Sequence, residues 1–392
     1  MKEPVPVLQI VNQFAIGGAE GQFVARVRRH PRGFRPVVAC IHRNGPNLAA
    51  IEELGLPIEE FGLRGSLAKL NTGHQILRLA AFMAREGVRL VHANDFYANL
   101  LAVPAARLAG AKVIASRFDL GHWYSRAHHV LEALASRTAD AVYTNAEAVR
   151  NMCLAQEGIP PDRVVVVHNG IDLDEFDRAR RWPLLAAVPG IEPGEDGRSR
   201  RPSVAIAANL YAVKGHLDLI EAMEIVRRSV PDVLVLCAGE GPMRPVLEQQ
   251  IRARGLRDNV VLLGHRLDVP AILQRAHLGC LCSRAEGLSN AVIECMAASL
   301  PVVATAVGGN VELVTEAGSG ASGHLVPPHR PAVLADRLIG LLRDPARRAA
   351  LGAAGRARVE SDLTLDAMIE KTGSLYEQVL SGRRPALRLR AA

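Results

Sequence analysis

Aromatic residues make up only 4% of this 392-residue sequence, and no apolar run approaches the roughly 20 residues that cross a membrane. The scarcity of aromatic side chains argues against a surface that stacks nucleic-acid bases. The N-terminus, with Glu3, Pro4 and Pro6 around a short apolar run, is not a signal peptide. These absences predict a cytoplasmic protein, attached at most peripherally to the inner face of the membrane.

The six cysteines have none of the paired CxxC spacings that mark zinc sites and redox motifs. Cys280 and Cys282 lie two residues apart in an expected strand, so they share one face, which favours packing over metal binding. Buried free thiols are the expected state, as suits a reducing compartment.

The composition is otherwise that of an ordinary globular protein, with 49% hydrophobic and 22% charged residues. The length exceeds the usual single-domain range of roughly 100 to 200 residues, so two domains are expected. The net charge of +7 allows a nucleic acid, an anionic membrane surface or a phosphorylated substrate as partner. Because aromatic residues are so few, we expect no nucleic acid.

Apolar runs alternate with helix-period stretches, which predicts an α/β class with parallel, doubly wound sheets. In such sheets ligands bind beyond the carboxyl ends of the strands, so the loops there are the candidate sites. In the first half, strands are expected at 5–11, 36–41, 89–92, 112–116, 141–144 and 163–168, and helices at 19–29, 67–85, 97–108 and 125–137.

From Arg178 to Arg201 the periodicity fails and proline and glycine accumulate, which indicates a linker. The alternation then restarts and runs to the end of a second α/β domain. The predicted organisation is an N-terminal domain at 1–180, a linker at 181–201, a C-terminal domain at 202–360, a helix at 361–380 that packs back toward the N-terminal domain, and a basic tail at 381–392.

Three loops that follow expected strands carry candidate phosphate-binding residues. Gly17 and Gly18 open a helix, but they lack the GxGxxG pattern, so a nicotinamide cofactor is disfavoured and no cofactor is expected. Lys214 precedes a helix, where its charge suits a diphosphate, although most lysines are solvated surface residues. Gly239 and Gly241 form either a loop for close approach of a ligand or simply a turn.

The stretch from Cys282 to Ala304 reads as a strand end, a loop, a helix and a second strand. Glu286 lies in the loop and Glu294 in the helix, about two turns below it on the same side. Two carboxylates so placed can accept hydrogen bonds from ribose or hexose hydroxyls. On spacing alone, however, one glutamate stabilised by the helix dipole and one exposed helix glutamate are the more common explanation.

Together with Val-Val-His-Asn-Gly-Ile-Asp at 166–172 and Leu-Pro-Val-Val-Ala-Thr at 300–305, these loops resemble glycosyltransferase family 4 over nearly the whole chain. The pieces occur in the family's order: the glycine loop, Asn-Gly-Ile-Asp, Lys-Gly, Gly-x-Gly, and two glutamates separated by seven residues. The resemblance implies the GT-B architecture, in which two Rossmann-like, doubly wound α/β domains face each other across a cleft.

The resemblance also implies a nucleoside-diphosphate sugar as donor. Glu286 would contact the sugar hydroxyls, Glu294 would hold the ribose, and Lys214 would neutralise the leaving diphosphate. Further backbone, base and diphosphate contacts would come from Gly17, Gly18, Asn209, Gly239, Gly241, His265, Arg266, Gly287, Leu288, Ser289 and Asn290.

One departure from the family pattern concerns charge. Asn209 stands five residues before Lys214, where the family usually has an arginine. One of two cations at the leaving group is therefore missing, unless Arg117 or Arg284 replaces it.

A second departure lies in the loop after the strand expected at 112–116. Asp119 occupies the place where the family commonly has a histidine near the reacting carbon, and His122 follows three residues later. Asp119 is the aligned catalytic candidate and His122 the alternate, while a helix-capping role for Asp119 is equally open.

The implied activity is retaining, metal-independent transfer of a hexose from a UDP- or GDP-sugar to a glycan or lipid-linked acceptor, in surface polysaccharide or glycolipid synthesis. No Asp-x-Asp motif lies near the candidate loops, and acceptor loops are expected at 66–74 and 96–99. Two alternatives stay open. The missing arginine and histidine would suit a nucleotide-sugar sensor or scaffold, and a sugar-nucleotide epimerase would need acid and base residues that the sequence does not reveal.

Overall fold

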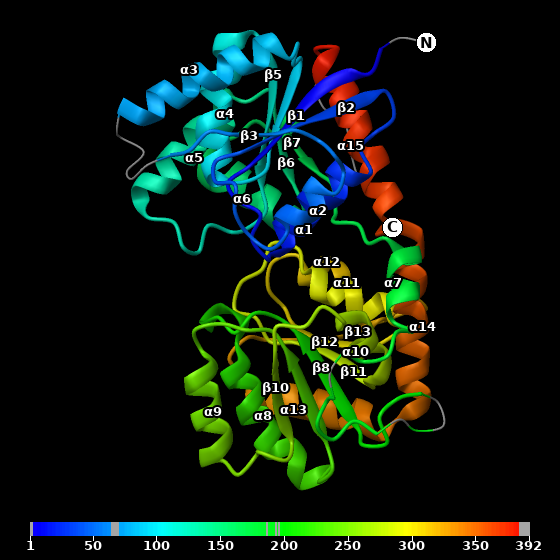
Figure 1. Ribbon diagram of the computed structural model, residues 1–392. Helices are drawn as coiled ribbons and strands as arrows, with labels where there is room; N and C mark the ends of the chain where they lie inside the picture. Colours follow the sequence, from blue (N-terminus) through cyan, green and yellow to red (C-terminus); the bar gives the residue numbers. More distant parts are fainter. Residues whose placement is uncertain (1–2, 64–69, 186, 193, 195–196, 384–392) are drawn as a thin grey trace. The chain divides into compact units, whose positions relative to one another are not determined.

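A computed structural model describes residues 3–63, 70–185, 187–192, 194 and 197–383. The chain forms two compact units, one comprising Met1–Gly170 with Leu365–Ala392 and the other Ile171–Thr364. Each unit is built around a parallel sheet with helices (Figure 1). The α/β class and the doubly wound sheets predicted from the alternation are confirmed.

The first unit contains a seven-stranded sheet in the order β3-β2-β1-β4-β5-β6-β7. The strand order reverses between β1 and β4, and the carboxyl ends of these two strands flank the point where such sheets bind ligands. The strands are β1 (Val5–Val11), β2 (Phe34–Cys40), β3 (Ile58–Glu60), β4 (Leu90–Ala93), β5 (Lys112–Arg117), β6 (Ala141–Thr144) and β7 (Val164–Val166).

Helices cover both faces of this sheet (Figure 1). Leu8 and Ile10 of β1 pack in a core with α3 (Leu70–Arg85) and α4 (Phe96–Ala109), whereas Val7 packs in a second core with α15 (Leu365–Leu380). Alternate residues of one strand thus serve opposite faces. The unit also contains α1 (Gly18–Arg28), α2 (Leu48–Glu52), α5 (Arg126–Thr138), α6 (Glu147–Glu157) and the 3₁₀ turn η1 (Pro161–Arg163).

The C-terminal helix α15 is tied to the first sheet by a buried polar contact. The Tyr376 hydroxyl accepts a hydrogen bond from Gln9 Nε2 (2.8 Å) and lies 2.7 Å from Nδ1 of His92. Burial lowers the pKa of His92 well below its usual value, so the imidazole is neutral in this contact. Although α15 follows the second unit in sequence, it is therefore part of the first.

The second unit repeats the strand order in a six-stranded sheet, β10-β9-β8-β11-β12-β13. Its strands are β8 (Ser203–Ala207), β9 (Leu234–Ala238), β10 (Val260–Gly264), β11 (Leu278–Leu281), β12 (Val302–Thr305) and β13 (Gly323–Val326). Its helices include α7 (Leu173–Ala179), η2 (Ala212–Lys214), α8 (His216–Ser229), α9 (Arg244–Ala253), α10 (Val269–Arg275), α11 (Asn290–Ala297), α12 (Asn310–Leu313), α13 (Pro331–Arg343) and α14 (Pro345–Asp362).

The structure corrects the domain boundaries that the sequence predicts. The sequence places the first boundary at residue 180, but the units divide after Gly170. In its described part, the expected linker at 181–201 packs on the second sheet, where Val188 is buried against Leu234 and Leu236. Proline and glycine there mark an irregular packed segment rather than a free linker. Residues 384–392 of the basic tail and 66–69 of one expected acceptor loop lie outside the described residues.

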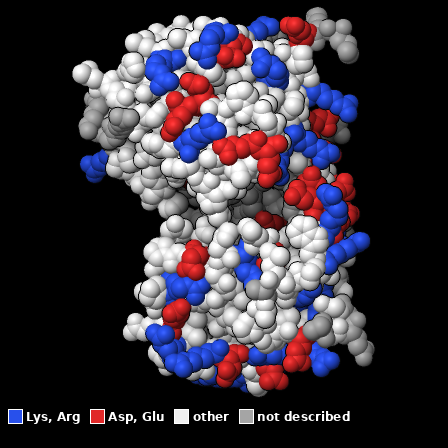
Figure 2. Space-filling model, in the orientation of Figure 1, with Lys and Arg blue, Asp and Glu red and all other residues white. Residues whose placement is uncertain are grey.

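Three surface and core properties bear on the sequence predictions. All six cysteines are buried and unpaired, which confirms the expected free thiols. No helix in the described part of the chain is long and apolar enough to span a membrane. On the face shown in Figure 2, basic and acidic side chains are interspersed, so the net charge of +7 does not form a single positive patch there.

Candidate active site

The carboxyl edge of the second sheet brings Lys214 and Glu286 into contact. Lys214 ends η2 after β8, Glu286 lies between β11 and α11, and β8 and β11 are neighbouring strands. Lys214 Nζ lies 2.6 Å from Glu286 Oε1. The Glu286 side chain is 9% exposed and that of Lys214 27%, so the ion pair is largely shielded from water. Two residues predicted from separate motifs thus meet at one edge of the sheet.

The Ser283 hydroxyl orients Glu286, and Thr305 holds the backbone of Ser283. The Ser283 hydroxyl donates to Glu286 Oε1 (2.6 Å), so two hydrogen bonds converge on the same oxygen. The Ser283 carbonyl accepts a hydrogen bond from the hydroxyl of Thr305, the last residue of β12 (2.6 Å). Ser283 was not predicted from the sequence, although its place just after a strand was an available signal.

The backbone of the Glu286 loop is fixed by two glycines that were likewise not predicted. Gly308 has a φ of +51°, and a Cβ atom there would lie 1.8 Å from the Glu286 carbonyl oxygen. Gly309 donates its N–H to the Gly287 carbonyl (2.6 Å). Only glycine suits position 308, because both the left-handed backbone and the close approach exclude a side chain.

The segment from Gly287 to Asn290 leads from the Glu286 loop into α11, as the sequence predicts. Leu288 and Ser289 are buried, and Ser289 is the N-cap. Because the first N–H groups of a helix lack partners within the helix, this terminus favours an anion.

Glu294 lies in the second turn of α11 and is half-buried. Its carboxylate has no hydrogen-bond or ion-pair partner among the described residues. Burial raises the pKa of Glu294 to about 7. The carboxylate is therefore available to accept hydrogen bonds from a ligand once it is ionised.

The loops after β8 and β9 pack backbone against backbone at this edge, and Asn209, in the loop after β8, is half-buried. A Cβ atom at Gly239 would lie 2.1 Å from the Ala208 carbonyl oxygen, and one at Gly241 would lie 2.6 Å from that of Leu210. Contact between the loops is therefore enough to explain both glycines, the simpler of the two explanations that the sequence left open.

The loop after β10 holds the two residues expected near the base. His265 is exposed, but Arg266 is engaged by Asp268 through two hydrogen bonds, Nε to Oδ1 (2.7 Å) and Nη2 to Oδ2 (2.6 Å). Asp268 also accepts the Leu185 N–H (2.7 Å). The Arg266 guanidinium therefore stabilises this loop.

Arg117 and Arg284, the two candidates for the missing cation, differ in burial and in their partners. Arg117 is buried in the first unit, where it forms ion pairs with Glu132 and Glu157, so it is not available to a ligand. Arg284 is 40% exposed and lies two residues before Glu286. Of the two arginines, Arg284 is therefore the remaining candidate for the second cation.

In the first unit, Gly17 is the N-cap of α1 and Gly18 its first residue. The Glu20 carboxylate folds over this turn, because a Cβ atom at Gly17 would lie 2.2 Å from Glu20 Oε2. Burial, aided by the charge of Asp95, raises the pKa of Glu20. A carboxylate at this turn opposes contact with a diphosphate unless it is protonated, which the raised pKa favours.

Asp119 and His122 lie in the loop between β5 and α5. Asp119 Oδ1 accepts the Gly121 N–H (2.7 Å), and Oδ2 accepts the Trp123 Nε1–H (3.1 Å). The N-cap of α5 is Ser125, so the alternative that Asp119 caps this helix is wrong. His122 is exposed.

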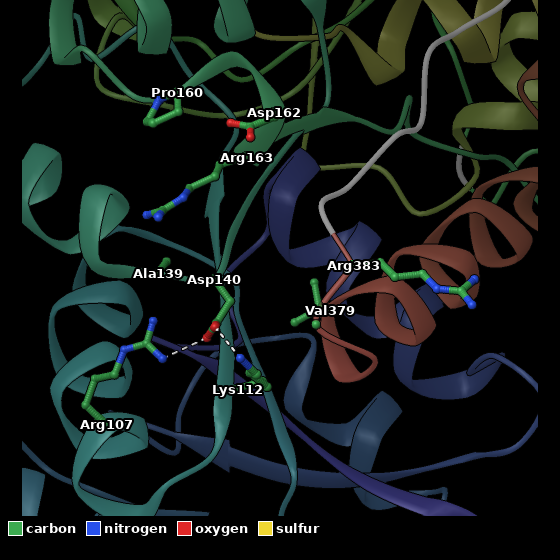
Figure 3. A pocket seen from close by; sticks show the side chains of 10 residues that line it. Arg107, Lys112, Ala139, Asp140, Pro160, Asp162, Arg163, Val379 and Arg383 are labelled. Atoms are coloured by element: carbon green, nitrogen blue, oxygen red, sulfur yellow. Dashed lines mark hydrogen bonds and ion pairs between the residues drawn. The ribbon is translucent and has the colours of Figure 1, made fainter.

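A pocket in the first unit lies at the opposite ends of the strands (Figure 3). It is lined by Arg107, Lys112, Asp140 and Arg163, and Val379 of α15 closes one side. Asp140 already binds Lys112 (3.0 Å) and Arg107 (2.9 Å). Lys112 begins β5, so this pocket is remote from the carboxyl-end loops and contains none of the predicted site residues.

Two family models match the chain in succession. The model described as Glycosyltransferase Family 4 matches residues 17–175, and the model described as Glycosyl transferases group 1 matches residues 194–358. The first match includes the glycine turn, and the second includes Lys214, Glu286 and Glu294.

Individual proteins give the same result. The chain is 29% identical to the alpha-D-kanosaminyltransferase of Streptomyces kanamyceticus, over 81% of this chain and 84% of that protein. It is 27% identical to the glycogen synthase of Mycobacterium tuberculosis H37Rv, over 80% and 76%. The crystal structure of Anabaena HepE in complex with UDP-glucose superposes with a TM-score of 0.80 at 20% identity, over 95% of this chain and 99% of that one, which shows a shared fold. The chain belongs to glycosyltransferase family 4 and has the GT-B fold.

Proposed function

We propose that this glycosyltransferase transfers a hexose, with retention of configuration, from a UDP- or GDP-sugar to a glycan or lipid-linked acceptor in surface polysaccharide or glycolipid synthesis. The observation that carries the proposal is the shielded contact between Lys214 and Glu286 beside the N-terminus of α11. A cation, the N-terminus of a helix and a carboxylate are the groups needed to hold a diphosphate and the hydroxyls of a sugar.

In the proposed reaction the acceptor oxygen bonds to the anomeric carbon as the bond from that carbon to the diphosphate oxygen breaks. The acceptor attacks the face from which the diphosphate leaves, and the leaving phosphate takes the acceptor's proton. Lys214 and the N–H groups of α11 stabilise the charge that builds on the diphosphate. Glu286 and Glu294 orient the hexose and the ribose, so the protein contributes mainly charge and positioning.

We also propose that the reaction needs no metal ion. No group of three or more His, Cys, Asp or Glu side chains within the described ranges is arranged to hold one. Lys214 and the α11 terminus supply positive charge that a metal ion provides elsewhere. Turnover should be unchanged in EDTA. A loss of turnover that magnesium or manganese restores would contradict metal independence.

The donor and the second candidate function are tested by one binding experiment. HepE binds UDP-glucose, which makes UDP-sugars the first donors to test and GDP-sugars the second. A ligand at about 100 times its dissociation constant stabilises the native protein by about 2.7 kcal/mol, so thermal shift with UDP, GDP and their glucose and mannose derivatives identifies the donor. Binding followed by release of nucleotide supports the enzyme. Binding without turnover across an acceptor panel supports a sensor, which Asn209 in place of arginine favours.

Substitution of Glu286 tests the site itself. Glu286→Gln should lower turnover by about 10²–10³-fold, because its charge and hydrogen bonds orient the reacting sugar. Glu221→Gln is the control, since Glu221 is an exposed carboxylate on α8 that pairs with Arg254. Equal turnover in the Glu286 and Glu221 variants would remove Glu286 from the site.

We also propose that the protein attaches peripherally to an anionic membrane. Helix α5 exposes Val130 (68%) and Leu134 (60%) on one side, with Arg126 at its start and Arg137 in its last turn. An apolar stripe flanked by cations is typical of helices that lie in the membrane interface. Val130→Ser with Leu134→Ser should abolish cosedimentation with phosphatidylglycerol vesicles. Leu267→Ser, at a still more exposed leucine of the second unit (76%), should not.

A further inference from the structure

We propose that the indole ring of Trp123 is the platform on which the acceptor binds, and that the acceptor group recognised there is a pyranose ring. Asp119 is then a positioning residue that holds this ring in place. The inference rests on the proposed transferase function and names the acceptor class of that function.

Trp123 combines exposure with firm support. Its side chain is 45% exposed, yet Nε1–H donates to Asp119 Oδ2 (3.1 Å). The ring packs edge-on against Tyr124 (centroids 4.4 Å apart) and Phe96 (5.8 Å). A third edge contact joins the ring to His128 (5.8 Å). An exposed tryptophan fixed by a hydrogen bond and three edge contacts presents a ring of defined orientation, at little entropic cost on binding.

Aromatic residues are concentrated here although they form only 4% of the chain. Phe96 contacts Tyr97, Trp123, Tyr124 and His128 with centroid distances between 5.0 and 5.8 Å. Phe96 itself is buried, so it serves as the base of the cluster, and Trp123 is the member with an open surface. The cluster includes Phe96 and Tyr97 from the segment at 96–99, where the sequence predicts an acceptor loop.

The cluster lies at the functional edge of the first sheet. Trp123 follows β5 and Phe96 follows β4, and these neighbouring strands end at the same edge. Asp95, next to Phe96, accepts the Asn12 N–H of the loop after β1 (2.6 Å). The three loops at the carboxyl ends of β1, β4 and β5 are thus connected through named contacts, at the point where doubly wound sheets bind ligands.

The groups around Trp123 favour a sugar over an acyl chain. The imidazoles of His122 and His128 lie on the same short segment as the indole ring. A pyranose has an apolar face that stacks on an aromatic ring and hydroxyl groups at its rim that bond to such polar side chains. Lys214, Glu294 and the N-terminus of α11, all in the second unit, are already proposed to bind the nucleotide of the donor, so Trp123 is not needed for that role.

The same contacts decide the role of Asp119. Both of its carboxylate oxygens are occupied inside the loop, by the Gly121 N–H and the Trp123 indole. A group engaged in this way acts on the reaction through Trp123. The sequence position that suggested direct catalysis is therefore the position that orients the acceptor platform.

Fluorescence tests the platform without requiring turnover. Trp182→Phe removes the other tryptophan of the chain, so Trp123 is then the one source of tryptophan fluorescence. The probes are methyl α-D-glucopyranoside, methyl α-D-mannopyranoside, N-acetylglucosamine, decyl phosphate and UDP. Saturable quenching or a spectral shift with one of the sugars supports the proposal. No response to any sugar, or a response only to decyl phosphate or only to UDP, overturns it.

Kinetics with the acceptor that responds separates positioning from catalysis. Trp123→Ala should raise the acceptor KM by about tenfold or more, and Trp123→Phe should restore most of the affinity because it keeps a ring. Asp119→Asn should likewise raise KM with little change in kcat. A loss of kcat at constant KM in Asp119→Asn would assign Asp119 to catalysis and overturn its positioning role. Trp182→Ala, at a 52% exposed tryptophan of the second unit, is the matched control.

Stabilisation by UDP is measured on every variant. It reports folding and binding at Lys214, Glu286 and Glu294, the proposed donor residues of the second unit. If UDP stabilises wild type and variants but Trp123 does not respond to sugars, the acceptor inference alone fails. If no nucleotide stabilises the wild type, the proposed function fails first.

Discussion

Separating Lys214 from Glu286 should cost both stability and turnover, because their ion pair is shielded and lies where the diphosphate is proposed to leave. In Lys214→Met, the Glu286 carboxylate keeps the Ser283 hydrogen bond (2.6 Å) but loses the cation at 2.6 Å. Since only 9% of the Glu286 side chain is exposed, water compensates little for that loss.

The size of the effect follows from this burial. Breaking a buried ion pair on one side typically costs about 3–5 kcal/mol, and the partial exposure of Lys214 reduces the expected loss of unfolding free energy to about 1–3 kcal/mol. Glu286→Gln should lose a similar or smaller amount. In the double variant neither charge is left without its partner, so the losses should fall short of additivity by about 1–2 kcal/mol. Turnover of Lys214→Met should fall by about 10²–10³-fold.

Urea denaturation of wild type, both single variants and the double variant measures this coupling directly. The control cycle uses Arg254 and Glu221, whose contact is longer (3.7 Å) and more exposed, and it should show no measurable coupling. Additive losses in the Lys214 and Glu286 cycle, to within about 0.5 kcal/mol, would refute the reasoning. Full turnover in Lys214→Met would separately refute the role at the leaving group.

Two further predictions concern α11 and the loop before it. Burial raises the pKa of Glu294 from 4.5 to about 7, so the folded protein binds this proton more tightly than the unfolded chain does, and the Glu294 contribution to stability falls as pH rises from about 5 to 7. Relative to wild type, Glu294→Gln should therefore gain about 1–3 kcal/mol across that range in thermal unfolding, and a pH-independent difference would contradict the raised pKa. Gly308→Ala should destabilise the protein by about 2–4 kcal/mol in urea, because its Cβ meets a carbonyl oxygen, whereas Gly318→Ala, also at positive φ but in open space, should lose only about 1 kcal/mol. Equal losses at the two glycines would show that backbone conformation alone decides the effect.

The sheets were predictable because their signal is local. A strand such as β1 and the helix after it each carry their own period, and repeated alternation leaves few arrangements other than a doubly wound parallel sheet. The elements missed were mostly short ones. The strand β3 (Ile58–Glu60) and the helix α2 (Leu48–Glu52) are too short to display a period, and β3 is stabilised by pairing with the longer strand β2.

The assignment of segments to units was not predictable from local pattern. Val188 lies in a proline- and glycine-rich stretch, and only its burial against β9 shows that the stretch is packed. The hydroxyl of Tyr376 contacts His92 across 284 residues of sequence. Such contacts depend on tertiary geometry, which composition and spacing along the chain do not carry.

In the candidate site, too, the sequence identified single residues, and the tertiary structure determined their contacts. Motifs predicted Lys214 and Glu286 individually, and the adjacency of β8 and β11 makes them partners. Asp119 was assigned by its position after a strand, but hydrogen-bond geometry decides what a carboxylate does. Its two oxygens are used within the loop, and Ser125 caps the helix instead.

The charge balance at the proposed donor site also bears on the asparagine at position 209. Lys214 and Glu286 neutralise each other, so a doubly charged diphosphate needs positive charge beyond this pair. We propose that Arg284 meets that need, because its backbone N–H is anchored to the Val213 carbonyl (2.7 Å) while, among the described residues, its guanidinium makes only a long contact to Asp218 (3.8 Å). A side chain that is 40% exposed and weakly held can turn toward an anion at little cost. We therefore expect the second cation to come from the loop after β11 rather than from position 209 in the loop after β8, so that the proposed site keeps the charge that departure of a diphosphate requires.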